Sequence, residues 1–200
     1  MNERFEFGLA LVQEAGEVAL GYFNARDQLT IQNKGPQDLA SEADVNTELL
    51  IRDRLAKAFP QDAFLGEETL PTEYTAGQGI WVVDPIDGTQ PFILGMSSWC
   101  VSIGFMQDGV IQFGMVYAPA RDELFAGGRN IPATLNGKPI HVSRRSQLAD
   151  AMITVGFSKN KESIEAGMVR FRRLLTQVRK TRILGSAALG MAYVACGRLD

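Results

Sequence analysis

The feature that most constrains the fold is residues 99–118, where two apolar segments flank Asp108-Gly109. The segments, WCVSIGFMQ and VIQFGMVYA, contain the β-branched and aromatic residues typical of strands. Asp-Gly is a favoured pair for the type I′ turn, which joins antiparallel strands in a hairpin. The segment ELFAGG continues the pattern, and Asn136-Gly137 predicts another tight turn before KPIHVS. This part of the chain is therefore expected to form an antiparallel sheet.

Two helices are expected before this sheet. Apolar residues recur at helical spacing over residues 3–25, and residues 42–59 form a second helical segment. Ser41 is suited to cap the second helix and Pro60 to end it. The connecting segments fit a short strand or loop at 29–34, a strand at 63–65, a loop at 69–79 and a strand at 80–84. Helices followed by mostly antiparallel strands predict an α+β domain over residues 1–145.

The pattern changes after residue 146. A strand (AMITVGFS), a basic amphipathic helix (162–179), a short strand (RILG, 182–185) and a small-residue helix (186–197) follow in turn. This alternation predicts a second α/β unit over residues 146–200, incomplete at its C-terminus because two strands leave the helices half exposed. The basic residues of this unit favour a solvated helix face over a phosphate-steering or partner surface. They are Arg170, Arg172, Arg173, Arg179, Lys180 and Arg182.

Composition excludes several classes of function. The 200 residues carry a formal net charge of −3, so general nucleic-acid binding is not expected. No apolar run is long enough for a membrane span, and the acidic N-terminal segment predicts a helix rather than a signal peptide. A single histidine, His141, argues against a His-based triad or a multi-His zinc site. Cys100 and Cys196 are expected to be buried free thiols of a cytoplasmic protein.

Acidic residues recur at the ends of expected elements. DLASEAD contains Asp38 and Asp44, LGEET contains Glu67 and Glu68, and DPIDGT contains Asp84 and Asp87. Carboxylates that converge at one edge of a sheet repel one another, and each would be driven towards protonation. A divalent cation removes this repulsion, and oxygen ligands without nearby His or Cys suit Mg²⁺ or Mn²⁺.

The segment DPIDGT adds detail to this hypothesis. Its proline fixes the backbone and leaves the carbonyl of Ile86 free to point where Asp84 points. Asp84 and Asp87 can then each hold a cation, while Gly88 and Thr89 offer amides for an anion at the start of a helical turn. An isolated turn of this composition is common. Together with the other acidic pairs, however, it favours metal-assisted phosphoryl transfer. An EF-hand lacks support because its distal Glu is absent, and the haloacid dehalogenase motif has one residue between its acids, not two.

Four motifs resemble those of the inositol monophosphatase family, the lithium-sensitive, Mg²⁺-dependent phosphatases. They are KGPQDLASEAD, FLGEE, WVVDPIDGT and GSAALGMAYVACGRLD, and the resemblance covers essentially all 200 residues. It implies a layered α-β-α-β-α sandwich of the sugar/inositol phosphatase type, commonly a homodimer. It also implies a metal-activated water that attacks a small phosphorylated substrate, with two or three Mg²⁺ ions and Mn²⁺ as a possible substitute.

The resemblance also implies roles for individual residues. The implied metal ligands are Glu67, Asp84, the Ile86 carbonyl and Asp87. The residues implied to position and activate water, or to hold a further metal, are Glu67, Thr89 and Asp44. The implied substrate and phosphate contacts are Asp87, Gly88, Thr89, Gly185, Ser186 and Ala187. Lys34 is expected near the metal site.

Three departures from the family pattern stand out. Gln90-Pro91-Phe92 replaces the usual Thr-Asn-Phe after Gly-Thr, and Ser41 replaces a Thr. The chain also contains no Trp-Asp motif, whose Asp completes the second metal site in the family. A fragment or truncated form, binding the second metal poorly and turning over slowly, is therefore expected.

The substrate stays open at this point. Inositol-1-phosphate is the family default, and the alternatives are histidinol phosphate, fructose 1,6-bisphosphate and 3′-phosphoadenosine phosphates. Trp99 and Gln90-Pro91 lean towards the histidinol phosphate branch as a resemblance. A hypothesis of another class is a regulatory binding protein that acts on transcription, with the basic helix 162–182 as its surface.

Overall fold

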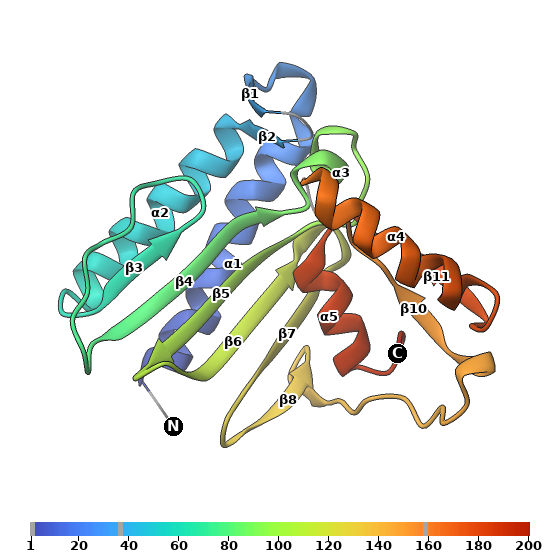
Figure 1. Ribbon diagram of the computed structural model, residues 1–200. Helices are drawn as coiled ribbons and strands as arrows, with labels where there is room; N and C mark the ends of the chain where they lie inside the picture. The colour runs from blue at the N-terminus through green and yellow to red at the C-terminus, as the bar shows by residue number, and fades with distance from the viewer. Residues whose placement is uncertain (1–2, 36–37, 158–159) are drawn as a thin grey trace.

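Two long helices, α1 (Glu3–Asn24) and α2 (Glu42–Ala58), lie side by side on one face of the larger sheet (Figure 1). This computed structural model describes residues 3–35, 38–157 and 160–200. Both predicted helices are confirmed. Ser41 caps α2, as expected, by accepting a hydrogen bond from the amide of Ala43, and α2 ends shortly before Pro60.

Within the described part of the chain, the larger sheet has the strand order β3-β4-β5-β6-β7-β8-β9. Its strands are β3 (Ala63–Gly66), β4 (Gly79–Asp87), β5 (Cys100–Gln107), β6 (Val110–Ala118), β7 (Glu123–Gly128), β8 (Ile131–Leu135) and β9 (Lys138–Pro139). Only β3 and β4 pair in parallel; the other neighbours are antiparallel. Asp108 and Gly109 have φ of 53° and 73°, so both turn residues adopt the positive φ of a type I′ hairpin, as predicted.

Shorter elements connect these layers. They are η1 (Arg26–Gln28), the antiparallel pair β1 (Ile31–Gly35) and β2 (Asp38–Ser41), α3 (Thr89–Ile93), η2 (Pro119–Arg121) and η3 (Leu148–Asp150). The short helix α3 follows β4 directly, at the point where the sequence predicted a helical turn after Gly88.

The C-terminal part has its own small sheet, in which β10 (Met152–Thr154) pairs in parallel with β11 (Lys180–Arg182). Helix α4 (Lys161–Leu175) connects them, and α5 (Ala187–Ala195) packs on the face of the larger sheet opposite α1 (Figure 1). The strand predicted at 182–185 is present, but it lies earlier in the chain, at Lys180–Arg182. Pairing stops at Arg182 because the chain then turns through Gly185, whose φ of 79° suits a loop leading into α5. Helix 162–179 was also predicted too long.

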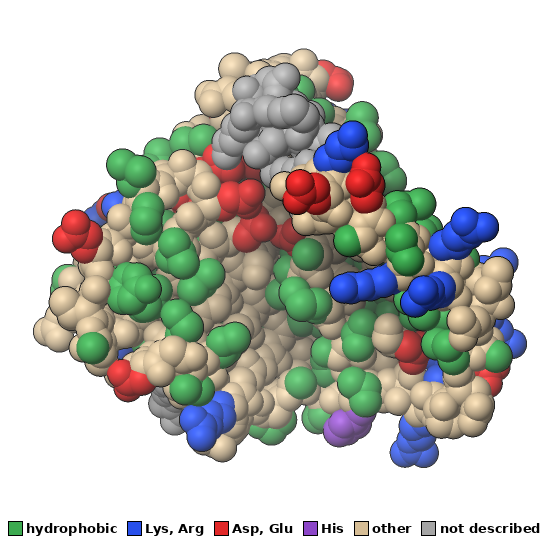
Figure 2. Space-filling model, viewed as in Figure 1, with side chains coloured by type: hydrophobic (Ala, Val, Ile, Leu, Met, Phe, Trp, Pro, Cys, Tyr) green, Lys and Arg blue, Asp and Glu red, His purple; other side chains and the backbone are tan. Residues whose placement is uncertain are grey.

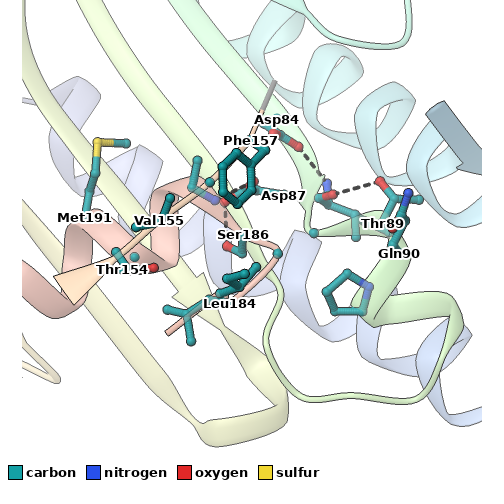
Figure 3. Close-up of a pocket in the computed structure, with 18 of the residues that line it drawn as sticks. Asp84, Asp87, Thr89, Gln90, Thr154, Val155, Phe157, Leu184, Ser186 and Met191 are labelled. Carbon is teal, nitrogen blue, oxygen red and sulfur yellow. Dashed lines mark hydrogen bonds between the residues drawn. The ribbon is translucent and has the colours of Figure 1, made fainter. Parts of the chain in front are cut away.

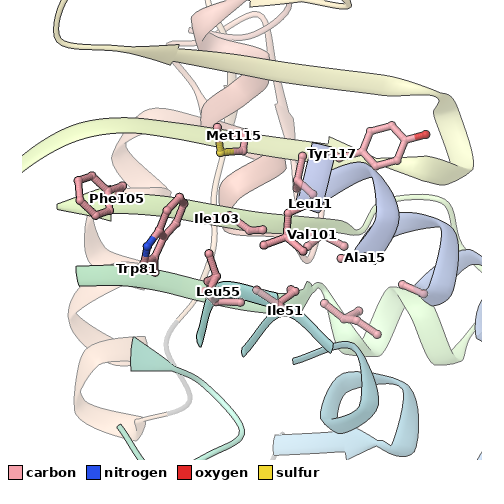
Figure 4. Close-up of a cluster of buried hydrophobic side chains, with 14 of the residues drawn as sticks. Leu11, Ala15, Ile51, Leu55, Trp81, Val101, Ile103, Phe105, Met115 and Tyr117 are labelled. Carbon is pink, nitrogen blue, oxygen red and sulfur yellow. The ribbon is translucent and has the colours of Figure 1, made fainter. Parts of the chain in front are cut away.

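The main core lies between the helices and the larger sheet (Figure 4). Trp81, Ile103 and Met115 from the sheet pack with Leu11 and Ile51 from the helices, all at most 2% exposed. A second core gathers around α5.

That second core joins Cys100 and Phe125 of the sheet to Leu189 of α5. Side chains from both sides of the predicted domain boundary, between residues 145 and 146, share this core. The boundary itself stays a prediction.

Two expectations drawn from composition can be compared with the structure. Both cysteines are free thiols, but Cys196 is only partly buried, whereas Cys100 is buried as expected. None of the described helices is long and apolar enough to cross a bilayer.

Candidate active site

A cavity of about 730 Å³ lies between the end of β4, the segment after β3 and the start of α5 (Figure 3). It is lined by nearly all the predicted site residues: Glu67, Asp84, Ile86, Asp87, Gly88, Thr89, Gly185, Ser186 and Ala187. These residues come from segments that are far apart in the sequence, and the fold brings them to one place. The space-filling view shows acidic side chains gathered where this surface is hollowed (Figure 2).

An irregularity in β4 places Asp84 and Asp87 on the same side. Side chains alternate along a strand, so residues three apart would normally point to opposite faces. Here the register shifts between them, because Asp84 pairs with Ser102 while Asp87 pairs with Cys100. Three steps on β4 therefore match two on β5, as in a β-bulge, and both carboxyl groups line the cavity. The strand was predicted to end at Asp84, and it continues to Asp87 because of this bulge.

Asp84 has a strongly raised pKa in this site. Burial, followed by the nearby charges of Glu67 and Asp87, raises the pKa of Asp84 from 3.8 to about 9, and Asp84 shares a hydrogen bond with Glu67. The amide of Ile86 donates to Asp84 Oδ1 at 3.2 Å and offsets this only in part. The repulsion between converging carboxylates that the sequence predicted thus contributes to the raised pKa of Asp84, and burial contributes more.

Asp87 is turned towards helix α5. Its carboxylate accepts hydrogen bonds from Ser186 Oγ at 2.5 Å and from the amides of Ala187 at 3.1 Å and Ala188 at 2.6 Å. An anion at a helix N-terminus is stabilised by the unpaired amides and the helix dipole. Cys100 Sγ lies 3.7 Å from Asp87 Oδ2, and burial together with Asp87 raises the pKa of that thiol well above its usual value.

This orientation bears on the predicted metal site. The donors are all oxygens, as Mg²⁺ prefers, and burial together with the charges of Glu67 and Asp87 raises the pKa of Asp84. The donor chemistry therefore fits. However, across residues 3–35, 38–157 and 160–200, no three acidic, cysteine or histidine side chains converge closely enough to enclose an ion. The fit in arrangement is partial, because Asp87 faces α5 rather than Asp84.

Asp44 lies behind the cavity instead of lining it. Its Oδ1 accepts a hydrogen bond from Thr89 Oγ1 at 3.1 Å, and its Oδ2 accepts from the amide and the hydroxyl of Ser41 at 2.8 and 2.6 Å. At 2% exposed, Asp44 contacts Thr89 directly and caps α2. The Thr89 hydroxyl also lies 3.3 Å from the Ile86 carbonyl, which is an alternative acceptor for its single proton.

Two glycines allow the segments of the cavity to meet. Gly88 has φ of 103°, and a Cβ there would lie 2.9 Å from the carbonyl oxygen of Ser98. A Cβ on Gly185 would lie 2.7 Å from the ring of Pro91. Pro91, which departs from the family pattern, thus packs against the loop that leads into α5.

The sequence did not single out several residues of the site. Glu48, which is completely buried, accepts hydrogen bonds from the amides of Glu68 at 2.8 Å and Thr69 at 2.7 Å. Its spacing of four residues from Asp44 on one helix was the signal that could have revealed it. Val155, Phe157, Ile183 and Met191 also line the cavity and add apolar surface to it. The side chains of Lys34 and Asp38 lie outside the described part of the structure.

The fold and site together define a mixed α/β protein that gathers carboxyl groups and a helix N-terminus in one cavity. The sequence model of the Inositol monophosphatase family matches residues 1–200. The chain therefore belongs to the inositol monophosphatase family.

Individual relatives agree with this assignment. Inositol monophosphatase 2 of Solanum lycopersicum is 38% identical over 100% of this chain and 77% of that protein. Nus factor SuhB of Xylella fastidiosa is 37% identical over 94% of this chain and 68% of that protein. The crystal structure of extragenic suppressor protein suhB from Bartonella henselae matches with a TM-score of 0.94 at 33% identity, over 100% of this chain and 77% of that chain.

Proposed function

We propose that the protein is a Mg²⁺-dependent phosphomonoesterase that hydrolyses a small phosphorylated alcohol such as inositol-1-phosphate. The observation that carries this proposal is the gathering of Glu67, Asp84 and Asp87 in one cavity with the amides that follow β4, where burial and acidic neighbours raise the pKa of Asp84. The family assignment and the relative named inositol monophosphatase 2 support it.

The proposed ligands for Mg²⁺ are Glu67, Asp84, the Ile86 carbonyl and Asp87, with two or three ions in all and Mn²⁺ as a substitute. When bound, Mg²⁺ supplies positive charge that polarises a phosphoryl oxygen and lowers the pKa of water. Asp84 must release its proton for this, and Asp87 must share its oxygens between α5 and the cation.

The remaining chemistry falls to the chain itself. Because the Thr89 hydroxyl donates to Asp44 or to the Ile86 carbonyl, its oxygen can accept a hydrogen bond from an attacking water. Glu67, which lines the same cavity, is placed to hold the other proton of that water. Amides in the first turn of a helix lack partners within the helix, so those after Gly88 are suited to hold phosphate oxygens.

The choice of substrate stays open within this proposal. A cavity of about 730 Å³ can take a phosphorylated sugar, cyclitol or amino alcohol. Histidinol phosphate, fructose 1,6-bisphosphate and 3′-phosphoadenosine phosphates therefore remain alternatives. We also propose a cytoplasmic homodimer and the layered α-β-α-β-α sandwich of the sugar/inositol phosphatase type, with the second α/β unit incomplete.

A regulatory role in transcription is the second candidate. Helix α4 has no buried residue and exposes Met168, Val169 and Leu175 beside Arg172, which is a surface suited to a partner. The similarity to a protein named Nus factor SuhB supports testing it.

Phosphate release separates these functions. The chain is incubated with Mg²⁺ and each of the four substrate classes, with and without Li⁺, and Asp84→Asn serves as the comparison. We expect Mg²⁺-dependent release from at least one substrate and its loss in Asp84→Asn with an unchanged circular dichroism spectrum. Absence of release from every substrate at saturating Mg²⁺ or Mn²⁺ would contradict the proposal.

A further inference from the structure

We propose that Glu48 is a positioning residue that fixes the Glu67 carboxyl group for cation binding by holding the backbone of the loop after β3. This inference rests on the proposed function, because it assigns Glu67 to the metal. Glu48 itself does not line the cavity, and it acts through the amides of the loop.

The geometry begins on helix α2. Asp44, Glu48 and Arg52 follow one another at intervals of four residues, which places them on one face of the helix. Asp44 fixes the hydroxyl of Thr89 on one side of the cavity. Glu48 fixes the loop that carries Glu67 on the other, so one helix face supports two segments of the site.

The contact between Glu48 and the loop uses both carboxyl oxygens. Oε2 accepts from the amide of Glu68 at 2.8 Å, and Oε1 accepts from the amide of Thr69 at 2.7 Å. One turn further along, Arg52 donates to Thr69 Oγ1 at 2.9 Å and to the Leu70 carbonyl at 3.2 Å. The loop is thereby tied to α2 immediately after Glu67, although Glu67 itself is exposed.

The residue at position 66 is fitted to this contact. A Cβ on Gly66 would lie 2.4 Å from the Glu48 carboxyl group. A larger residue at position 66 would therefore require the Glu48 carboxyl group to move from its place between the two amides. Gly66 ends β3 and directly precedes Glu67, so the contact determines where the Glu67 side chain starts.

A role in stability alone would not call for this residue. Burying a carboxyl group away from water is costly, and a well-packed apolar side chain would fill the space at a lower cost. What Glu48 adds is directional: two acceptors that orient consecutive amides. Groups that orient metal ligands from behind typically change metal affinity by about 10- to 100-fold when they are removed.

The test compares Glu48→Gln with Asp53→Asn in the full 200-residue chain. Glutamine keeps the size of the side chain but replaces one acceptor with an NH₂ group that cannot accept from an amide. Asp53→Asn removes the same charge from an exposed position of the same helix, where Asp53 pairs with Lys57 at 2.6 Å. The Mg²⁺ concentration at half-saturation is measured twice, from the rise in melting temperature and from phosphate release.

We expect the half-saturating Mg²⁺ concentration to rise by about 10-fold or more in Glu48→Gln, with a smaller change in kcat at saturating Mg²⁺. Asp53→Asn should match the wild type. A lower melting temperature with unchanged half-saturation would show a purely structural role and overturn the inference. If the wild type responds to Mg²⁺ in melting but releases no phosphate, the proposed function fails while the melting series still tests Glu48.

A second variant covers the case in which Glu48→Gln does not fold. Gly66→Ala displaces the Glu48 carboxyl group from the opposite side without removing it, and should raise the half-saturating Mg²⁺ concentration in the same direction. Wild-type half-saturation in folded Gly66→Ala would overturn the inference. So would rapid hydrogen exchange of the Glu68 and Thr69 amides in the wild type, since both are held by a buried acceptor.

Discussion

The raised pKa of Asp84 predicts that the metal-free protein loses stability as the pH rises. The pKa of Asp84 in the folded state is about 9, against an ordinary value of 3.8 that applies to the unfolded chain. The folded state therefore binds the proton more tightly than the unfolded state does. The stabilisation from this group is complete below about pH 4, is lost progressively as the pH rises, and is gone above about pH 9.

The magnitude follows from the shift. Each pH unit between 3.8 and neutrality lowers the free energy of unfolding by about 1.4 kcal/mol. The loss between pH 3.8 and pH 7 is therefore at most roughly 4 kcal/mol. Asp84→Asn removes the titration but keeps an oxygen that can accept from the Ile86 amide. In EDTA, the variant should therefore be more stable than the wild type at pH 8, and its stability should depend less on pH.

Urea denaturation from pH 5 to pH 9, in EDTA and in Mg²⁺, is the assay. In Mg²⁺ the wild type should regain stability, increasingly so at high pH, because the cation binds the deprotonated cluster. At 100 times the dissociation constant this linkage amounts to about 2.7 kcal/mol. Asp84→Asn should show little of it. A wild-type stability in EDTA that rises from pH 5 to pH 9, or a variant with the same slope as the wild type, would refute the reasoning.

Three further predictions concern the segments around the cavity. Ser186→Ala removes the N-cap of α5 and should lower the free energy of unfolding by about 1 kcal/mol in urea denaturation. Gly185→Ala, which adds a Cβ at φ of 79° and 2.7 Å from a proline ring, should cost more than 1 kcal/mol. The matched control Gly156→Ala, with no atom within 4 Å of the new Cβ, should be nearly neutral, and equal effects would contradict the clash. A thiol reagent followed by mass spectrometry should modify the partly buried Cys196 well before Cys100, whose buried thiol has a raised pKa; the reverse order would contradict this environment.

Local signals explain the parts of the fold that the sequence predicted. The hairpin around Asp108-Gly109 and the cap at Ser41 depend on residues next to each other in the chain, so the pattern was sufficient. The strand predicted at RILG was placed too late in the chain, because Ile183 and Leu184 line the cavity instead of pairing with β10. Apolar composition alone does not distinguish those two environments.

The sequence predicted which residues gather at the cavity, but it did not predict how they are arranged there. The acidic motifs identified Glu67, Asp84 and Asp87, which line the cavity, because carboxyl groups that converge at strand ends repel one another unless a cation or a proton compensates their charge. The bulge in β4 that turns Asp84 and Asp87 to one side depends on pairing with β5, which no local pattern records. The placement of Asp44 behind Thr89 likewise depends on how α2 packs on the sheet.

Asp44, Glu48, Asp84 and Asp87, which lie in or behind the cavity, differ in how the negative charge of the carboxyl group is compensated, and this difference indicates where we propose that a cation binds. Asp44 accepts three hydrogen bonds from Ser41 and Thr89, and Glu48 accepts two from the amides of its loop. Asp87 accepts three at the N-terminus of α5. Asp84 accepts from the amide of Ile86, shares a hydrogen bond with Glu67 and has two acidic neighbours, and these surroundings favour its protonated form. A divalent ion that replaces this proton would compensate the charge of Asp84, and it would do so near the Thr89 hydroxyl that we propose positions the attacking water.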